Sequence, residues 1–237
     1  MGVMRSHGRD VVDGQKVFND PWQCRAVAFM DDFLGDVIED GWNIDADAGC
    51  SGAIEVLAGG VVRLQTDATT SDRVSMAHEL NWYGERNAIF ECRFKIDAIT
   101  NVNLFFGFSD AKAEASQLLP MSLSGTTWTT TATDAVGFVF DTAATTDVLY
   151  GMGVANGTDA TAVQSTSAPV AATYMKLRIE LFDGSAAFYI DDVIVGGSTG
   201  FLTSTVALTP LIGVQNRTTA ARLLDIDYVY LAQDRAA

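Results

Sequence analysis

Cysteine, proline and long apolar runs are all scarce in this chain of 237 residues. The three cysteines, Cys24, Cys50 and Cys92, are too few and too widely spaced for a disulfide framework or a zinc site, so we expect reduced thiols. No segment approaches the roughly 18 consecutive apolar residues that a membrane-spanning helix needs, and the start lacks the apolar core of a secretory signal. These absences argue against a disulfide scaffold and against a membrane partner.

Basic residues are scarce as well. Lys and Arg number 15 against 30 Asp and Glu, which gives a formal net charge of -15 at pH 7. A surface of this sign repels phosphate, so we expect neither DNA nor RNA as a partner. Hydrophobic residues still make up 48% of the chain, which is enough to build a packed core.

The first 25 residues differ from the rest in charge and in pattern. They carry four basic residues against three acidic ones, and their apolar residues do not alternate. We therefore expect an extended N-terminal arm over residues 1–25 and a single β-sandwich domain over residues 26–237. A frayed terminus is the alternative to an arm that lies on a partner. The side chains that we expect to contact a partner are Arg5, Arg9, Val17, Phe18 and Trp22.

After the arm, the sequence has the pattern of short β-strands. Residues 89–96 alternate between apolar and charged side chains, which places Cys92 on the inward face. Residues 175–181 repeat the alternation, and Asp183-Gly184 after them is typical of a hairpin turn. Further short apolar runs with Gly-rich turns between them predict an all-β protein.

Only one segment has the composition of a helix. Residues 110–119 are rich in good helix formers and begin with an N-cap type of residue, so we expect at most one short helix there. The Ser/Thr-rich stretch around Trp128, residues 122–133, is expected to be a long loop or a β-excursion.

A series of motifs along the chain carries a resemblance to a known family. The motifs lie at residues 29–35, 91–95, 105–110, 136–140, 188–195, 211–214 and 224–230. In this order they resemble the strands of laminin-G-like and concanavalin A-like domains found in bacteriophage structural proteins. The resemblance implies a concanavalin A-like, two-sheet antiparallel jelly-roll sandwich, with the N-terminal arm outside it.

Enzymes of this fold class include glucanases whose catalytic carboxylates sit at alternate positions of one strand, as in Glu-x-Asp-x-Glu. Period 2 places such carboxylates on one face of a sheet, near enough to share the chemistry. The sequence has no such run; Asp225 and Asp227 alternate, but no third carboxylate follows, and a solvated strand face is the expected reading. His78, on an expected strand over residues 73–80, stands alone and fits a packing role. We therefore expect no enzymatic activity.

Two kinds of ligand remain open. Acidic residues crowd the first part of the sandwich, and carboxylate oxygens suit Ca²⁺, although no ligand set stands out and we expect no other cofactor. These residues are Asp31, Asp32, Asp36, Glu39, Asp40, Asp45 and Asp47. Exposed aromatic rings could instead stack on sugars; the candidates are Trp82, Tyr83 and Trp128, and packing over a sheet edge is the alternative for each.

Three functions compete at this stage. The resemblance favours a non-enzymatic virion protein, a bacteriophage capsid decoration (cement) protein that is assembled in the host cytoplasm. Such a protein would bind the major capsid protein lattice and copies of itself, as a homo-oligomer. The alternative is a carbohydrate- or receptor-binding module of a phage tail or fibre. A glucanase-like hydrolase is the third, and the missing carboxylate run argues against it.

Overall fold

The computed structural model describes residues 5–6, 9–10, 26–35, 37–38, 41–55 and 59–235. Within the arm, β1 (Arg5–Ser6) pairs with β2 (Arg9–Asp10), and no more is described of that segment. The predicted partner residues Val17, Phe18 and Trp22 lie outside the described residues, and so do the side chains of Arg5 and Arg9. The docking role of the arm therefore stays a prediction.

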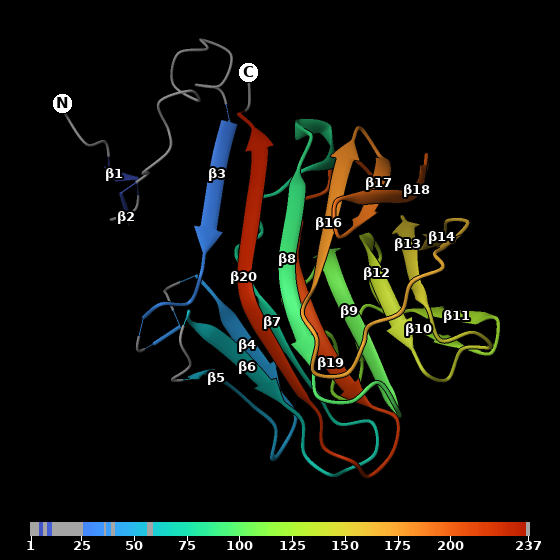
Figure 1. Ribbon diagram of the computed structural model, residues 1–237. Coiled ribbons are helices and arrows are strands. Elements are labelled where there is room, and N and C mark those ends of the chain that lie inside the picture. The colour runs from blue at the N-terminus through green and yellow to red at the C-terminus, as the bar shows by residue number, and fades with distance from the viewer. Residues whose placement is uncertain are drawn as a thin grey trace.

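The rest of the chain folds into two antiparallel sheets packed face to face (Figure 1). The sheet nearer the viewer, here called the front sheet, has the order β18-β17-β16-β8-β20-β6-β5, and β3 also pairs with β20. Its strands are β3 (Ala26–Asp31), β5 (Ser51–Glu55), β6 (Val61–Gln65), β8 (Ile89–Ile96), β16 (Met175–Phe182), β17 (Ser185–Ile190), β18 (Val193–Ser198) and β20 (Leu223–Asp234).

The second sheet, the back sheet, has the order β14-β13-β12-β9-β19-β7-β4, and β15 also pairs with β13. Its strands are β4 (Asn43–Ala46), β7 (Arg73–Ala77), β9 (Val102–Ser109), β12 (Ala135–Asp141), β13 (Leu149–Ala155), β14 (Thr158–Asp159), β15 (Val163–Gln164) and β19 (Thr209–Asn216). This arrangement confirms the predicted jelly-roll sandwich. The described part of the chain contains no helix long and apolar enough to cross a membrane.

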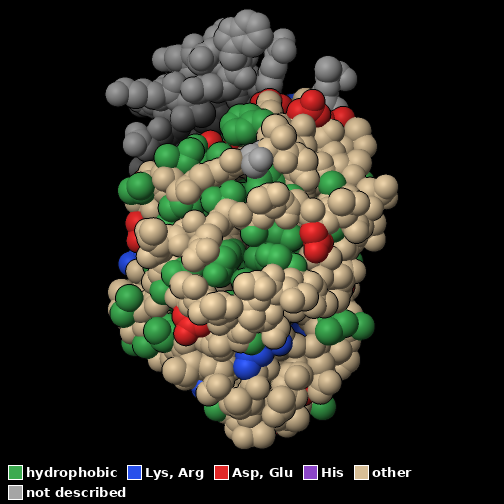
Figure 2. All heavy atoms as spheres, turned by 90° about the vertical axis from the view of Figure 1, so that its right-hand side faces the viewer, with side chains coloured by type: hydrophobic (Ala, Val, Ile, Leu, Met, Phe, Trp, Pro, Cys, Tyr) green, Lys and Arg blue, Asp and Glu red, His purple; other side chains and the backbone are tan. Residues whose placement is uncertain are grey.

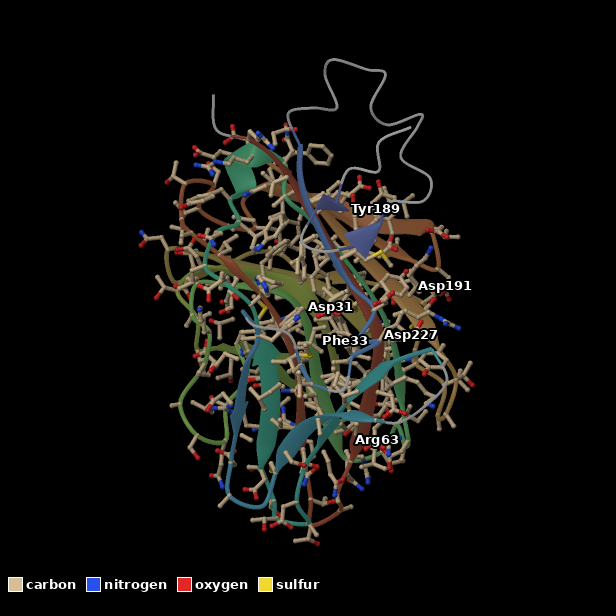
Figure 3. The ribbon with its side chains drawn as sticks, turned by 90° about the vertical axis from the view of Figure 1, so that its left-hand side faces the viewer. Asp31, Phe33, Arg63, Tyr189, Asp191 and Asp227 are labelled. Atoms are coloured by element: carbon tan, nitrogen blue, oxygen red, sulfur yellow. The ribbon has the colours of Figure 1, made fainter. Side chains whose placement is uncertain are left out.

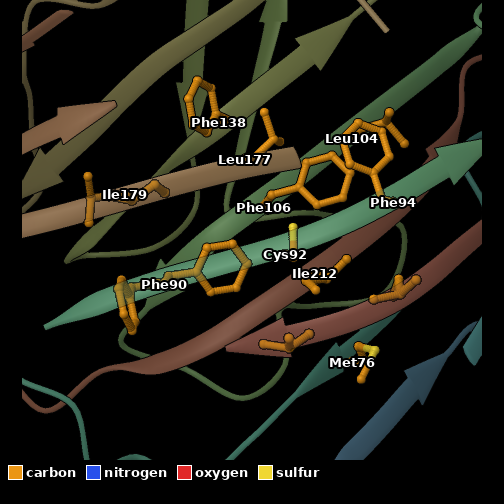
Figure 4. Packing of buried hydrophobic residues seen from close by; sticks show 14 of the residues in the cluster. Met76, Phe90, Cys92, Phe94, Leu104, Phe106, Phe138, Leu177, Ile179 and Ile212 are labelled. Atoms are coloured by element: carbon orange, nitrogen blue, oxygen red, sulfur yellow. The ribbon is translucent and has the colours of Figure 1, made fainter. Parts of the chain in front are cut away.

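The main core lies between the two sheets, and the alternation of β8 shows how the sequence builds it. Phe90, Cys92, Phe94 and Ile96 point inward and are fully or almost fully buried, as predicted. Across the gap, Phe94 stacks on Phe106 of β9 with ring centroids 4.2 Å apart (Figure 4). Aromatic rings at such distances add attraction beyond the burial of their surface.

Two tight turns connect the hairpin strands of the front sheet. Asp183 and Gly184, with φ of 44° and 81°, join β16 to β17 and confirm the predicted turn. Asp191 and Asp192, with φ of 47° and 66°, join β17 to β18 in the same way. Left-handed φ at both central residues is the geometry that two-residue hairpins prefer, and Asp tolerates it better than most residues.

Residues 110–119 do not form the short helix that the sequence predicts; the 3₁₀ turn Gly84–Arg86 is the one helical element among the described residues. Residues 110–119 begin a segment over residues 110–134, here called the excursion. The segment instead lies over the outer face of the back sheet. There β10 (Met121–Ser124) and β11 (Thr127–Thr130) form a hairpin, which confirms the predicted β-excursion. Leu119 and Met121 are buried in a second apolar cluster on that face, so burial at alternate residues outweighs helix propensity.

Candidate functional site

Asp225 and Asp227 are the carboxylates that alternate on one strand of the sequence. Arg63 contacts both carboxylate oxygens of Asp225, at 2.7 and 3.0 Å, and Lys95 Nζ lies 3.1 Å from Oδ2. Asp227 accepts a hydrogen bond of 2.8 Å from Arg93. Figure 3 shows Arg63 and Asp227 along the outer side of the front sheet. Asp225 is buried beneath its partners, so the solvated face expected for it is wrong.

The outer face of the back sheet is covered by the excursion. On β12 the residues that alternate toward this face are Ala135, Gly137, Val139 and Asp141. Asp141, the one carboxylate among them, is fully buried and pairs with Arg217. It also accepts hydrogen bonds from the backbone N–H of Leu123, at 2.9 Å, and of Ala143, at 3.0 Å. Its oxygens therefore hold the excursion and a loop in place.

His78 follows β7, which ends at Ala77, so the expected strand over residues 73–80 is three residues too long. The imidazole packs between the rings of Phe29 and Trp42, with centroids 4.7 and 5.0 Å away. Burial lowers the pKa of His78 below its ordinary value. These contacts agree with the packing role predicted for it.

The acidic residues proposed for Ca²⁺ have other partners where the structure describes them. Asp31 accepts hydrogen bonds from the indole N–H of Trp42, at 3.0 Å, and from the backbone N–H of Phe33, at 2.9 Å. Asp45 forms an ion pair of 2.5 Å with Arg73. Asp36, Glu39 and Asp40 lie outside the described residues. Among the residues that are described, no group of three or more His, Cys, Asp or Glu could hold a metal, so calcium stays a prediction.

The three aromatic candidates differ in their surroundings. The exposure expected of Trp82 is wrong: its side chain is 4% exposed and belongs to the main core. Tyr83 is half-buried, and the guanidinium of Arg86 covers its ring at 4.1 Å. Trp128 is also half-buried and packs edge-to-face on Tyr150 at 5.8 Å. A sugar-stacking role for Tyr83 and Trp128 stays a prediction.

A pocket of about 520 Å³ opens at one border of the sandwich, and its size is in the range of small-molecule sites. One wall is the segment Gln164–Ser167, and the other is the β17–β18 hairpin. Figure 2 looks onto this side of the molecule, where hydrophobic side chains gather among polar surface with few charges. The lining residues are Gln164, Ser165, Thr166, Ser167, Ile190, Asp191, Val193, Ile194 and Val195.

The wall of residues 164–167 is fixed to the back sheet. Gln164 pairs with Tyr150 of β13, the backbone N–H of Ser165 donates to Leu149 O at 3.0 Å, and Leu149 N–H donates to Ser167 O at 2.8 Å. The hydroxyl of Ser165 also accepts from the backbone N–H of Ser167 at 3.1 Å. Gln164 and Thr166, between these anchors, keep exposed side chains.

The opposite wall is fixed to the front sheet through the Asp191 turn. Backbone N–H of Lys176 donates to Asp191 Oδ1 at 2.9 Å, and Asp191 N–H donates back to Lys176 O at the same distance. The ammonium of Lys176 lies 2.6 Å from Asp192 Oδ2. Val193 and Ile194 are strongly exposed, whereas Ile190 is buried and closes the pocket from the core side. Two elements, each hydrogen-bonded to a different sheet, therefore form the walls of the pocket.

The lining combines three kinds of group. Gln164 offers an amide that donates and accepts, Thr166 offers a hydroxyl, and Asp191 offers a carboxylate. Val193 and Ile194 offer aliphatic surface. Lys and Arg are absent from the lining of this described pocket, so nothing in it favours a phosphate or another strong anion.

Sequence reasoning missed this pocket because its walls are far apart along the chain. The one signal was the pair Asp191-Asp192, which reads as a second hairpin turn with a carboxylate at each central position. Nothing in the alternation of residues 188–195 predicts that residues 164–167 lie opposite. Pairing between sheets is a tertiary property, which local patterns do not encode.

No family model and no curated protein matches the sequence. Solved structures do match the fold. The Emp47p carbohydrate recognition domain is similar with a TM-score of 0.61 and 9% identity, over 88% of this chain and 95% of that one. A Bacillus licheniformis β-glucanase is similar with a TM-score of 0.59 and 12% identity, over 86% of this chain and 97% of that one. An endo-β-1,4-glucuronan lyase from Trichoderma reesei is similar with a TM-score of 0.59 and 10% identity, over 88% of this chain and 95% of that one.

These likenesses correct one expectation and confirm another. The fold is a concanavalin A-like jelly-roll sandwich, as the resemblance implied. The expectation of a protein without enzymatic activity does not stand, because the same fold carries glucanases and a polysaccharide lyase. At identities near one tenth, the likenesses show the fold alone.

Proposed function

We propose that the chain is a carbohydrate-binding protein and that the pocket between residues 164–167 and the β17–β18 hairpin is its site. The observation that carries the proposal is the mixed lining, with an amide, hydroxyls and a carboxylate beside exposed aliphatic side chains. Sugars present both hydroxyl groups and C–H faces, so such a lining satisfies both. Carbohydrate is also the ligand class named for the Emp47p domain and for the glucanase.

Two other ligand classes fit the lining less well. A phosphorylated ligand would meet Asp191 and no lysine or arginine in the pocket wall. A wholly apolar ligand would bury the Gln164 amide and the Asp191 carboxylate without replacing the hydrogen bonds that water gives them. A polyhydroxylated ligand avoids both costs.

The experiment is a glycan array probed with the full chain, followed by titration calorimetry with the glycan that binds best. Asp191→Asn removes the charge but keeps an Oδ1 for Lys176 N–H and tolerates the left-handed φ of 47°. We expect this variant to bind about tenfold more weakly, the size of one charge-assisted hydrogen bond.

Asp183→Asn is the matched control, because Asp183 has a φ of 44° in the turn at the other end of β17. Its affinity should equal that of the unmodified chain. Equal losses in the two variants, or no binding to any glycan, would refute the proposed site. Release of new reducing ends from the bound glycan would show that the chain also cleaves it.

The virion reading is a separate proposal that rests on the sequence resemblance alone. No observation on the described residues bears on a capsid lattice, on a phage tail or on the particle as the location. It stays a prediction, and cosedimentation of the full chain with capsids would test it.

A further inference from the structure

The borders of the two sheets are protected in four different ways among the described strands. At one border of the back sheet, β14 and β15 have two residues each; at the other, Asp45 of β4 is held in an ion pair with Arg73. In the front sheet, β5 carries Gly52 and the ion pair of Glu55 with Arg63. Short strands, charges and glycines all discourage pairing with another chain.

The fourth border is β18, which lies opposite a register shift between Phe188 and Tyr189 and contains Gly196-Gly197. A β-bulge and consecutive glycines twist an edge and leave few side chains to pack. Every border considered so far therefore carries a recognisable barrier to edge-to-edge association.

The strand β3 carries none of these barriers on its exposed residues, and its one charged residue, Asp31, is buried. Its six residues, Ala-Val-Ala-Phe-Met-Asp, contain no Gly, Pro, Lys or bulge, and pair with β20 residue by residue. No described strand pairs with its other edge, and Figure 1 shows it at the border of the front sheet. Ala28 is exposed, and the exposed fractions of Val27 and Met30 are 41% and 51%. Alternate residues of such an edge direct backbone N–H and C=O groups outward.

We propose that β3 of a second copy occupies this edge, antiparallel to the first, so that the two front sheets join across a twofold axis. A twofold axis perpendicular to the sheet keeps the core faces of both copies on the same side and places one residue opposite itself. With Ala28 on the axis, Val27 of each copy lies opposite Phe29 of the other, and Met30 opposite Ala26.

A second copy fits better than a strand of another composition because β3 is complementary to itself. Four of its six residues are Ala, Val or Met, and its one charged residue, Asp31, is fully buried in hydrogen bonds to Trp42 and Phe33. If Phe29 lay on the axis, Val27 of each copy would lie opposite Asp31 of the other and pair an apolar side chain with a carboxylate. We therefore place Ala28 on the axis. Net charge of -15 on each copy opposes approach at long range, so added salt should strengthen the pair.

The test is sedimentation velocity of the full chain and of two matched variants. Ala28→Lys places two ammonium groups against each other at the axis, and like charges directly opposite destabilise a strand pair. Ala53→Lys makes the same change at an exposed alanine of β5, on the same sheet. We expect the unmodified chain and Ala53→Lys to sediment as dimers, with twice the chain mass of 25.3 kDa. We expect Ala28→Lys to sediment as a monomer.

A positive readout comes from Ala28→Cys. Cβ atoms of directly opposed residues lie about 4.5–5.5 Å apart, so oxidation should link two copies through these thiols, whereas Ala53→Cys should give no such link. A monomeric full chain would overturn the proposal and leave the edge to the arm or to another protein. A dimer that survives Ala28→Lys, or one lost equally in both lysine variants, would overturn it too.

Discussion

At the scale of single residues, the two described thiols differ in what surrounds them. Cys92 is fully buried between Phe90 and Phe94, and burial raises its pKa well above the ordinary value. Cys50 is half-buried directly before β5, where its sulfur accepts a hydrogen bond from the backbone N–H of Asp67 at 3.2 Å. A thiol reacts faster when the reagent can reach it and when more of it is present as the thiolate. We expect iodoacetamide to label Cys50 in the native protein long before Cys92, as followed by peptide mass spectrometry; comparable rates would contradict the register of β8.

The ion pairs of Asp225 give a second residue-scale prediction. Burial raises the pKa of Asp225, but the hydrogen bonds from Arg63 and Lys95 outweigh it and leave the pKa below its ordinary value. A lowered pKa means that the stabilisation is complete above about pH 4 and disappears as the pH falls through the native value. Asp225→Asn should lower the free energy of unfolding by about 1–3 kcal/mol at pH 7.

Urea unfolding of the unmodified chain and of Asp225→Asn at pH 7 and pH 3 checks this prediction. The difference between their free energies of unfolding should be smaller at pH 3. Asp227→Asn is the comparison, since Asp227 forms one ion pair, with the partly exposed Arg93, and its replacement should change the free energy of unfolding less. A pH-independent difference for Asp225→Asn would mean that packing, and not charge, explains the loss.

At the scale of elements, the excursion over the back sheet depends on a few buried side chains. Leu119 is 3% exposed in the second apolar cluster, whereas its neighbour Leu118 is 40% exposed. Leu119→Ala should reduce the free energy of unfolding by about 2–4 kcal/mol through the cavity that it leaves. Leu118→Ala should cost under about 1 kcal/mol. Chemical denaturation of both variants measures this, and equal losses would show that residues 110–134 do not pack as described.

The strands and their inward faces were largely predictable, whereas the excursion and the pocket were not. Residues 89–96 and 175–181 alternate because one face meets the core, and this local signal gave the sandwich and the burial of Cys92. Residues 110–119 have the composition of a helix but form bends and turns, because Leu119 and Met121 bury on a sheet that the local sequence does not reveal. Trp82 looked exposed for the same reason: its partner Leu208 is remote in sequence.

At the scale of the whole molecule, the fold alone does not determine the function, which has to be inferred from the residues of the site. The sandwich is shared with hydrolases, a lyase and a carbohydrate recognition domain. On this chain the excursion covers the outer face of the back sheet, and the described pocket opens instead at the border where β15 and β18 approach each other. Carbohydrate binding at that border is the central claim.

Hydrogen exchange with and without the best-bound glycan tests the central claim most directly. Backbone amides report which segments a ligand covers or stiffens, whatever the ligand's chemistry. We predict that a saturating glycan slows exchange in residues 163–167 and 190–195 and leaves the excursion over residues 110–134 unchanged. Slowing confined to the excursion, or to strands β6, β8 and β20 of the front sheet, would contradict the assignment of the pocket as the carbohydrate site.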